Sequence, residues 1–343
     1  MVPFWVDTMS TRILTGITTT GTPHLGNYVG AIRPAIEQSR DLNNQSFFFL
    51  ADYHALIKCD DPDRVHQSTL EIAATWLAFG LDVENVVFYR QSDIPEIPEL
   101  CWFLMCNTAK GVMNRAHAYK ARVQDNVEAQ TDPDHAVTMG LYTYPVLMAA
   151  DILLFNANKV PVGRDQEQHV EMARVIASRV NHHYNTDLAL PESVVDDDTA
   201  ILNGLDGRKM SKSYNNTIPL FDTAKKLKKS INKIKTNLLE PGEPKDPDTS
   251  TVFQVWQAFA TAEQTVSMRE AFTQGIAWGE AKKQLFELLD EQLQGPRAEY
   301  ALLMAEPGYI ESVLQKGAVR AREHAKPAMA SIRQAMGIYG LNK

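Results

Sequence analysis

Two lysines and two serines lie within five residues, 209–213, of the stretch DGRKMSKSYNN. No apolar period runs through this stretch, and the turn residues Asp206 and Gly207 place it in a loop rather than in a core. Ammonium groups on a mobile loop can follow negative charge as it moves between phosphate groups. The stretch therefore favours phosphate chemistry at Lys209 and Lys212, with a solvated basic turn as the alternative.

A second candidate site is the segment TGITTTGTPHLGN, residues 15–27, where a predicted strand ends, the chain turns at glycines and a helix begins. Nucleotides bind at such turns in parallel sheets, and free N–H groups at a helix start favour phosphate. His24 and Asn27 lie one helical turn apart at that start and point the same way. The segment is neither a GxGxxG fingerprint nor a Walker A loop, so an ordinary glycine-rich turn is equally open.

A carboxylate stands on an otherwise apolar helix face in YPVLMAAD, residues 144–151. Tyr144, Met148 and Asp151 occupy positions i, i+4 and i+7, which share one face. A buried carboxylate is costly unless a donor meets it. Asp151 therefore either bonds to a neighbouring backbone group or accepts from a substrate N–H or O–H inside a pocket of aromatic size.

The segment VPVGRDQEQH, residues 160–169, repeats the order of strand, glycine and helix start. Asp165 suits a helix N-cap, because its carboxylate can accept from the free N–H groups of the first turn. Alternatively, Gly163 lets a ribose or a substrate amine approach the backbone, with Asp165 and Gln166 as polar contacts. The segment alone does not decide between the two.

Two basic runs stand out in a chain whose formal net charge is −8. KKLKKSINKIK, residues 225–235, holds six lysines in eleven residues, and KGVMNRAHAYKAR, residues 110–122, holds four cations. An acidic protein binds nucleic acid through such local patches and not through its overall field. Each run is either a solvated helix face or a contact to a phosphate backbone.

An alternation of strands and helices must position these residues. Short β-type runs are predicted at 12–17, 46–52, 85–91 and 159–163, and the run at 46–52 is apolar enough for a strand buried on both faces. Helical patterns are predicted at 28–36 with a kink at Pro34, and at 61–80, 96–123, 143–155 and 165–180, with 123–134 as a polar loop. This order predicts an α/β fold with a doubly wound parallel sheet.

The helical pattern becomes almost continuous after residue 220, with EPGEPKDPDTS as its one long break. We therefore expect a loose extension over residues 1–10, a Rossmann-like α/β domain over 11–220 with a helical insertion at about 96–145, and an all-helical domain over 221–343. Met9 is a second possible start, because the strand pattern begins only after it.

Composition excludes several classes of protein. Apolar residues make up 44% of the 343 residues and charged residues 22%, as in soluble globular chains. Cys59, Cys101 and Cys106 show no C-x-x-C spacing, which disfavours a disulfide framework or a zinc site and fits a reducing compartment, so we expect the cytoplasm. The start is too polar for a signal peptide, and no apolar stretch is long enough to span a membrane.

Taken together, the four segments resemble class I aminoacyl-tRNA synthetases. HLGN at 24–27 is similar to the HIGH motif of that class, and KMSKS at 209–213 matches its second motif letter for letter. The resemblance runs from about residue 11 to the end of the chain. TYPVLMAADILL and VPVGRDQEQH look like pocket segments of the tryptophanyl branch, whereas the tyrosyl branch typically carries Gln where Met148 stands.

The resemblance implies a HIGH-type Rossmann-like catalytic domain and a helical anticodon-binding domain. It implies ATP-dependent activation of L-tryptophan to tryptophanyl-adenylate, with Mg²⁺ neutralising the phosphates, and transfer to the 3′-terminal adenosine of tRNA(Trp). Family members are homodimers, and neither DNA nor a membrane is an expected partner. The chain departs from the family at Thr18–Thr20, where Gln-Pro-Ser is usual, so a Gln contact to the amino acid would be lost.

Roles carried over by resemblance fall into three groups. The catalytic residues would be His24, Asn27, Lys120, Lys209 and Lys212. The ATP-binding residues would be Thr18, Thr19, Thr20, Gly26, Asn27, Gly163, Arg164, Asp165, Ile201, Lys209, Met210, Ser211, Lys212 and Ser213. The tryptophan-binding residues would be Gly16, His54, Tyr144, Met148, Asp151, Val162 and Gln166, with no metal held by the protein alone.

Three alternatives compete with this interpretation. A tyrosine-specific synthetase shares the fold but is disfavoured by Met148, because a soft thioether suits an indole better than a phenol. A nucleotidyltransferase with a small acceptor is disfavoured by the long helical region and its lysines. A synthetase paralogue that binds tryptophan or RNA without charging tRNA has no use for both intact motifs.

Overall fold

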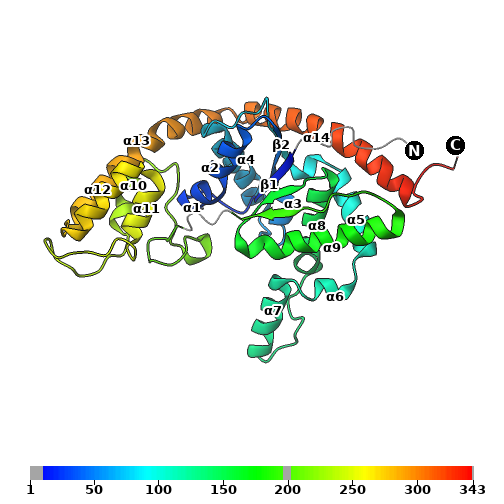
Figure 1. Ribbon diagram of the computed structural model, residues 1–343, viewed down its shortest axis with the longest axis horizontal. Helices are drawn as coiled ribbons and strands as arrows, with labels where there is room; N and C mark the ends of the chain where they lie inside the picture. The colour runs from blue at the N-terminus through cyan, green and yellow to red at the C-terminus, as the bar shows by residue number, and fades with distance from the viewer. Residues whose placement is uncertain (1–10, 196–201, 342–343) are drawn as a thin grey trace.

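The computed structural model describes residues 11–195 and 202–341, so the expected extension at 1–10 and Ile201 lie outside the described residues. Its centre is a sheet surrounded by helices (Figure 1). The strands are parallel and lie in the order β3-β2-β1-β4-β5. The strands are β1 (Thr11–Thr18), β2 (Asn44–Ala51), β3 (Val87–Arg90), β4 (Lys159–Pro161) and β5 (Glu192–Val194). The order reverses between β1 and β4, which confirms the predicted doubly wound α/β fold.

The central strand β2 shows why the sheet is buried on both faces. Its side chains alternate between two cores, as the strand period of two requires. Phe47 and Phe49 belong to one core, shared with the helices α5 (Glu96–Asn107), α8 (Met139–Leu154) and α9 (Glu167–Tyr184). Phe48 and Leu50 belong to another, shared with α4 (Pro62–Ala78) and part of α14 (Pro307–Ala335). The uninterrupted apolar run at 47–51 therefore reflects a strand covered by helices on each side.

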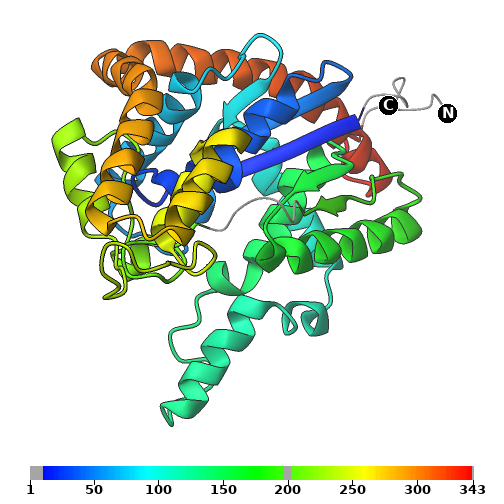
Figure 2. The same ribbon diagram turned by 60° about the vertical axis from the view of Figure 1, so that its left-hand side comes forward.

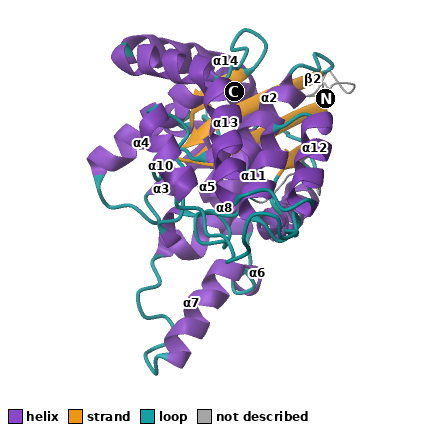
Figure 3. Ribbon diagram, turned by 90° about the vertical axis from the view of Figure 1, so that its left-hand side faces the viewer, coloured by secondary structure: helices purple, strands orange, loops and turns teal. Residues whose placement is uncertain are grey.

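Helices surround this sheet. The covering helices are α2 (Arg33–Ser39), α4 (Pro62–Ala78), α5 (Glu96–Asn107), α8 (Met139–Leu154), α9 (Glu167–Tyr184) and α14 (Pro307–Ala335). Short turns of helix are α1 (Leu25–Asn27), η1 (Tyr28–Ile32), α3 (Asp52–Ala55), η2 (Gln91–Asp93), η3 (Arg164–Gln166) and η4 (Lys212–Tyr214). The pair α6 (Lys110–Met113) and α7 (His117–Glu128) forms an arm that projects from the body in Figures 1, 2 and 3.

The kink predicted at Pro34 is present as one wide helical turn. Between α1 and α2 the chain forms the π-type turn η1, in which the Arg33 N–H donates to Tyr28 O five residues earlier. Pro34 has no N–H to donate, so the regular hydrogen-bond ladder cannot pass through it. The wide turn lets the helix continue from the first motif into α2.

The prediction of a polar loop at 123–134 is wrong in its first half, because α7 runs on to Glu128. The reason is a tertiary contact. Asn126 is buried, and its side-chain amide donates to Pro133 O at 2.9 Å and to His135 O at 2.8 Å. The loop after α7 folds back onto this amide. The polar residue Asn126, which suggested a loop, therefore lies within the helix and is stabilised there by the loop.

The chain after residue 221 is helical, as predicted. Its helices are α10 (Ala224–Asn232), α11 (Thr251–Phe259), α12 (Ala262–Thr273), α13 (Trp278–Ala305) and α14. The first helices share a separate core that includes Phe253, Phe272 and Leu285. The stretch 233–250 carries no helix or strand, which matches the predicted break.

The last helix, α14, returns to the sheet and lies over β3 (Figure 2). A Cβ added at Gly317 would lie 1.6 Å from Phe88 O, so only glycine permits this approach. Arg320 donates to Val83 O and Val86 O beside the same strand. The helical region thus packs in a core that it shares with Leu25 and Met210, and through α14 it also covers the sheet. The domain bounds stay a prediction. None of the described helices combines the length and apolar character needed to cross a membrane.

Candidate active site

The carboxyl ends of β1 and β4 flank the point where the strand order reverses, and the candidate residues gather there. Gly16 and Thr18 are exposed at the end of β1, Thr20 is half-buried, and Thr19 is fully buried with its hydroxyl unpaired. The Phe49 ring lies against Gly16, where an added Cβ would stand 2.4 Å from it. The strand end therefore offers an open backbone surface beside the reversal point.

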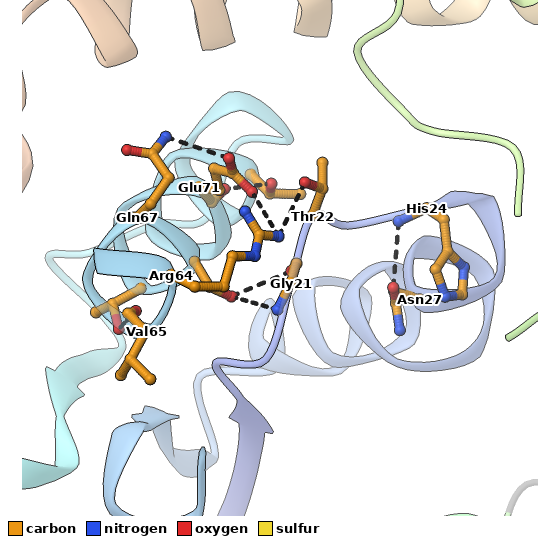
Figure 4. A network of polar contacts seen from close by, with 11 residues as sticks. Gly21, Thr22, His24, Asn27, Arg64, Val65, Gln67 and Glu71 are labelled. Atoms are coloured by element: carbon orange, nitrogen blue, oxygen red, sulfur yellow. Dashed lines mark hydrogen bonds and ion pairs between the residues drawn. The ribbon is translucent and has the colours of Figure 1, made fainter. Parts of the chain in front are cut away.

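Helix α4 holds the loop that follows β1 (Figure 4). Ser68 Oγ accepts from the Gly21 N–H at 2.7 Å and donates to Gly21 O at 3.1 Å. Arg64 Nη2 donates to Thr22 Oγ1 at 3.1 Å and lies 3.7 Å from a carboxylate oxygen of Glu71. Sequence reasoning missed these residues, although both cation and hydroxyl lie in the first two turns of a predicted helix.

His24 begins the short helix α1, and its backbone N–H donates to Asn27 Oδ1 at 3.2 Å. Burial, with the nearby Lys212 cation, lowers the pKa of His24 to about 4, so the ring is neutral at pH 7. Its Nδ1 atom is buried without a partner. The Leu25 N–H donates to Ile218 O, so this N–H is not free for phosphate as the helix-start argument assumed.

The two motifs meet in space. The first motif pairs with the chain just after KMSKS through an antiparallel bridge between His24 and Pro219. A Cβ at Gly26 would lie 3.1 Å from His24 Nδ1 and 3.5 Å from Met210 Cβ, so Gly26 is the close-contact point between the motifs. Met210 is buried in the same core as Leu25, which anchors the second motif beside the first.

Lys212 lies over the loop after β1. A Cβ at Gly21, whose φ is +149°, would lie 3.1 Å from both Lys212 Nζ and Arg64 Nη2. Two cations thus converge on one glycine. Desolvation by the surrounding protein, followed by the charge of Arg64, lowers the pKa of Lys212 to about 8 although its side chain is still partly exposed. Such a pair fits an anion that would approach the same loop.

The other residues of KMSKS face solvent or each other. Lys209 is exposed, and Ser211 Oγ and Ser213 Oγ lie 2.8 Å apart in a hydroxyl–hydroxyl hydrogen bond. The Arg208 guanidinium lies 4.2 Å from the centre of the Tyr214 ring. Lys209 is therefore exposed on this loop, Lys212 Nζ faces the loop after β1, and Met210 is buried.

Asp151 is fully buried and has side-chain partners. Gln91 Nε2 donates to both carboxylate oxygens at 2.8 and 3.0 Å, and His54 Nε2 lies 3.0 Å from Oδ2. The expectation of a backbone partner is therefore wrong. Burial raises the pKa of Asp151, and the bonds from His54 and Gln91 oppose that shift.

A second polar chain lies beside His54, whose ring centre is 6.4 Å from that of Tyr144. Tyr144 Oη lies 2.8 Å from His169 Nε2, and His169 Nδ1 lies 2.8 Å from Gln166 Oε1. Burial lowers the pKa of His169 to about 4, with a smaller contribution from a neighbouring histidine, so the ring is neutral. Met148 and Val162 are partly buried against the adjoining core.

Gln91 and His169 were missed by sequence reasoning. Gln91 is the last residue of a predicted strand, and His169 lies three residues after Gln166 in the predicted helix at 165–180, so position alone could have suggested both.

Asp165 does not cap α9, which corrects one of the two expectations for it. Helix α9 begins at Glu167 after the turn η3, and Asp165 instead accepts from Gln166 Nε2 at 2.8 Å. Gly163 and Arg164 are exposed beside it, and a Cβ at Gly163 would lie 2.9 Å from Asp165 Oδ1. The glycine thus allows the carboxylate to fold back over the turn.

Lys120 is not brought into contact with the two motifs. It lies on α7 in the projecting arm, with an exposed side chain that forms no hydrogen bond or ion pair with either motif. The base of the arm is tied to α9, because Gln168 accepts from the His117 N–H at 2.9 Å and donates to Arg115 O at 3.0 Å. A role at the phosphates would require the arm to move.

The lysine run at 225–235 forms the exposed face of α10 and the turn after it. All six lysines are exposed, while Leu227, Ile231 and Ile234 are buried in the core of the helical region. Among the described residues no group of three His, Cys, Asp or Glu side chains is placed to hold a metal ion.

Comparison with known proteins places these features in a family. Residues 7–294 match the family model described as tRNA synthetases class I (W and Y). The Tryptophan–tRNA ligase of Pseudomonas aeruginosa is 62% identical over 338 residues, covering 98% of this chain and 75% of that protein. The Tryptophan–tRNA ligase of Neisseria meningitidis is 58% identical over 328 residues, covering 95% of this chain and 98% of that protein.

Among solved structures, the tryptophanyl-tRNA synthetase of Campylobacter jejuni complexed with ADP and tryptophan superposes with a TM-score of 0.85. It is 38% identical in sequence, and the match covers 95% of this chain and 100% of that one.

Proposed function

The chain belongs to the class I tRNA synthetases of the tryptophan and tyrosine family, and from this premise we propose that it activates L-tryptophan with ATP and joins it to the 3′-terminal adenosine of tRNA(Trp). The observation that carries the proposal is the meeting of HLGN and KMSKS at Gly26, in a chain that also holds the buried Asp151 carboxylate between Gln91 and His54. The two motifs form the phosphate side of the site and the pocket forms the amino-acid side.

Asp151 gives the pocket its preference for an indole. A carboxylate has about four acceptor positions, and Gln91 and His54 use three of them, so one remains for the indole N–H, which can only donate. Met148 supplies a polarisable wall that packs on an aromatic ring. An amino acid without a donor at that place would leave Asp151 short of a partner, which disfavours its activation.

Activation needs positioning and charge stabilisation rather than a general base, because the tryptophan carboxylate is already ionised. One of its oxygens forms a bond to the α-phosphorus of ATP as the bond to the bridging oxygen breaks, and pyrophosphate leaves with the electron pair. We assign Lys212 and Lys209 to the charge that accumulates on pyrophosphate. The neutral ring of His24 stands at the helix start, where it can contact the phosphates without adding charge.

The threonines after β1 take the place of the family's Gln-Pro-Ser. Thr18 is exposed at the strand end and offers a hydroxyl and backbone groups, so the ATP contacts proposed for Thr18–Thr20 do not need the Gln side chain. Lys120 would join the phosphates only after the arm bends toward the sheet. Gly163, Arg164 and Asp165 line the open turn after β4, on the ribose side of the proposed site.

Mg²⁺ fits this site as a companion of the nucleotide. The described residues offer no cluster of acidic or histidine ligands, whereas cations face the loop after β1, so ATP oxygens would supply the ligands. When bound, the ion would neutralise phosphate charge.

We assign the lysine face of α10 to the phosphate backbone of tRNA and the helical region to its anticodon. As in the family, we expect a homodimer, and the three free cysteines fit the reducing cytoplasm.

Charging of a tRNA(Trp) transcript with radiolabelled tryptophan tests the proposal. Label should enter the transcript only when both ATP and this protein are present. Binding of the transcript without charging would contradict the proposal and favour the non-charging alternative.

A further inference from the structure

The KMSKS segment belongs to a compact loop, residues 204–216, whose centre is the side chain of Asn216. Asn216 is 2% exposed, although the residues around it are polar. Its Oδ1 accepts from the Ser211 N–H at 2.8 Å, and its Nδ2 donates to Lys209 O at 3.1 Å and Arg208 O at 3.3 Å. One carboxamide thus forms hydrogen bonds with the backbone on both sides of Met210.

A second layer of contacts holds this carboxamide. Asn216 Nδ2 donates to Asp206 Oδ1 at 2.7 Å, and Arg208 Nε donates to Asp206 Oδ2 at 2.7 Å. The bond from Asn216 is the largest cause that lowers the pKa of Asp206 to about 2. A Cβ at Gly204 would lie 2.4 Å from Asn216 Cγ, so the loop closes around the side chain only with glycine there.

The two lysines depend on this frame for their direction. Neither Lys209 nor Lys212 uses its ammonium group in a hydrogen bond or ion pair within the described chain, so each is placed by its backbone. Asn216 bonds to the carbonyl of Lys209 and to the N–H of Ser211, immediately before Lys212. It therefore fixes the separation and orientation of the two cations together.

We infer that Asn216 is a positioning residue for adenylate formation: it makes the KMSKS loop one rigid unit that delivers Lys209 and Lys212 to the leaving pyrophosphate in a fixed relation. The inference rests on the proposed function. Loop closure would then be a movement of the whole unit, with no rearrangement between the lysines. Displacing a catalytic charge by about 1 Å can lower a rate roughly 100-fold, which sets the expected effect.

The substitution Asn216→Asp keeps the size and replaces the donor by an acceptor facing Asp206. It should lower the rate of tryptophanyl-adenylate formation about 100-fold at saturating substrates and leave the KM for tryptophan within about twofold. The matched control is Asn215→Asp, since Asn215 is the adjacent, exposed residue with no side-chain hydrogen bond in the described chain. That control should stay within about twofold of the wild type.

A second experiment separates positioning from general instability. In a Lys209→Ala, Lys212→Ala background, Asn216→Asp should lower the rate of tryptophanyl-adenylate formation by less than about threefold, because the cations that Asn216 positions are absent. Adding Asp206→Asn to Asn216→Asp should recover part of the rate, since a donor again faces an acceptor across the loop.

The inference is overturned if Asn216→Asp lowers tryptophan affinity and Tm together with the rate, if the rate is unchanged, or if the loss is the same without the lysines. An inactive wild-type protein would instead contradict the proposed function itself, so the two failures are distinguishable.

Discussion

Raising the pH above 8 should weaken the use of ATP, because Lys212 loses its charge there. Desolvation by the surrounding protein and the Arg64 cation hold the pKa of Lys212 at about 8, below the ordinary 10.5 of a lysine. Arg64→Gln removes the neighbouring charge and should raise the pH at which the use of ATP begins to fall. Glu71→Gln should move it downward, because the Glu71 carboxylate raises the same pKa.

The size of the effect follows from the titration. With a pKa of about 8, roughly nine-tenths of Lys212 is protonated at pH 7 and about one-tenth at pH 9. If the protonated form is the one that binds the phosphates, kcat/KM for ATP falls about tenfold for each pH unit above 8. This parameter reports the free enzyme, so the phosphates of bound ATP do not mask the titration.

The assay is tryptophan-dependent ATP–pyrophosphate exchange from pH 6.5 to 10, at saturating tryptophan and constant ionic strength. The plot of kcat/KM for ATP against pH should begin to fall near pH 8 for the wild type. The same fall should begin at higher pH for Arg64→Gln and at lower pH for Glu71→Gln. A profile that stays flat to pH 9.5 would refute the role of Lys212. Displacement of both variants in the same direction would refute the assignment of Arg64 and Glu71 as opposing influences.

Three further predictions concern the pocket and the fold. Asp151→Asn should raise the KM for tryptophan roughly 10- to 150-fold, because a charge-assisted bond contributes about 1.5–3 kcal/mol; steady-state exchange that shows an equal rise for ATP would contradict the indole assignment. Because the folded-state pKa of His169 is about 4, the unfolded chain binds more protons between pH 6.5 and 4, and stability in urea should fall as the pH is lowered through that window. The His169→Gln variant should show a flatter pH dependence, and an unchanged slope would count against the buried neutral ring. Gly317→Ala should lower Tm by several degrees, since its Cβ would overlap Phe88 O; Gly308→Ala, which has open space, is the control, and equal Tm values would contradict the close packing of α14.

Local rules were enough to predict the fold and to single out the four candidate segments. Residues at the ends of predicted strands, such as Thr18 and Gly163, are expected at one edge of a parallel sheet, because the carboxyl ends of parallel strands meet there. The run at 46–52 predicted a buried strand because it is short and mostly apolar, as strands covered on both faces are. The two motifs were found through the types and spacing of their residues.

The remaining features depend on contacts between distant segments, which spacing does not contain. Gln91 bonds to Asp151 across sixty positions of sequence, and Arg64 on α4 bonds to Thr22 in the loop after β1. The capping role given to Asp165 was reasonable locally, but its carboxylate bonds to the neighbouring Gln166 side chain instead. Asn216 looked like part of a polar turn, and only the folded loop shows it to be a buried centre.

The central claim is that this chain activates tryptophan at the junction of its two motifs. Amino-acid-dependent ATP–pyrophosphate exchange, run with each standard amino acid in turn, tests it most directly. The account predicts exchange with tryptophan alone. Exchange with tyrosine would keep the fold and the phosphate chemistry but contradict the pocket formed by Met148 and Asp151, and no exchange with any amino acid would contradict the activation step itself.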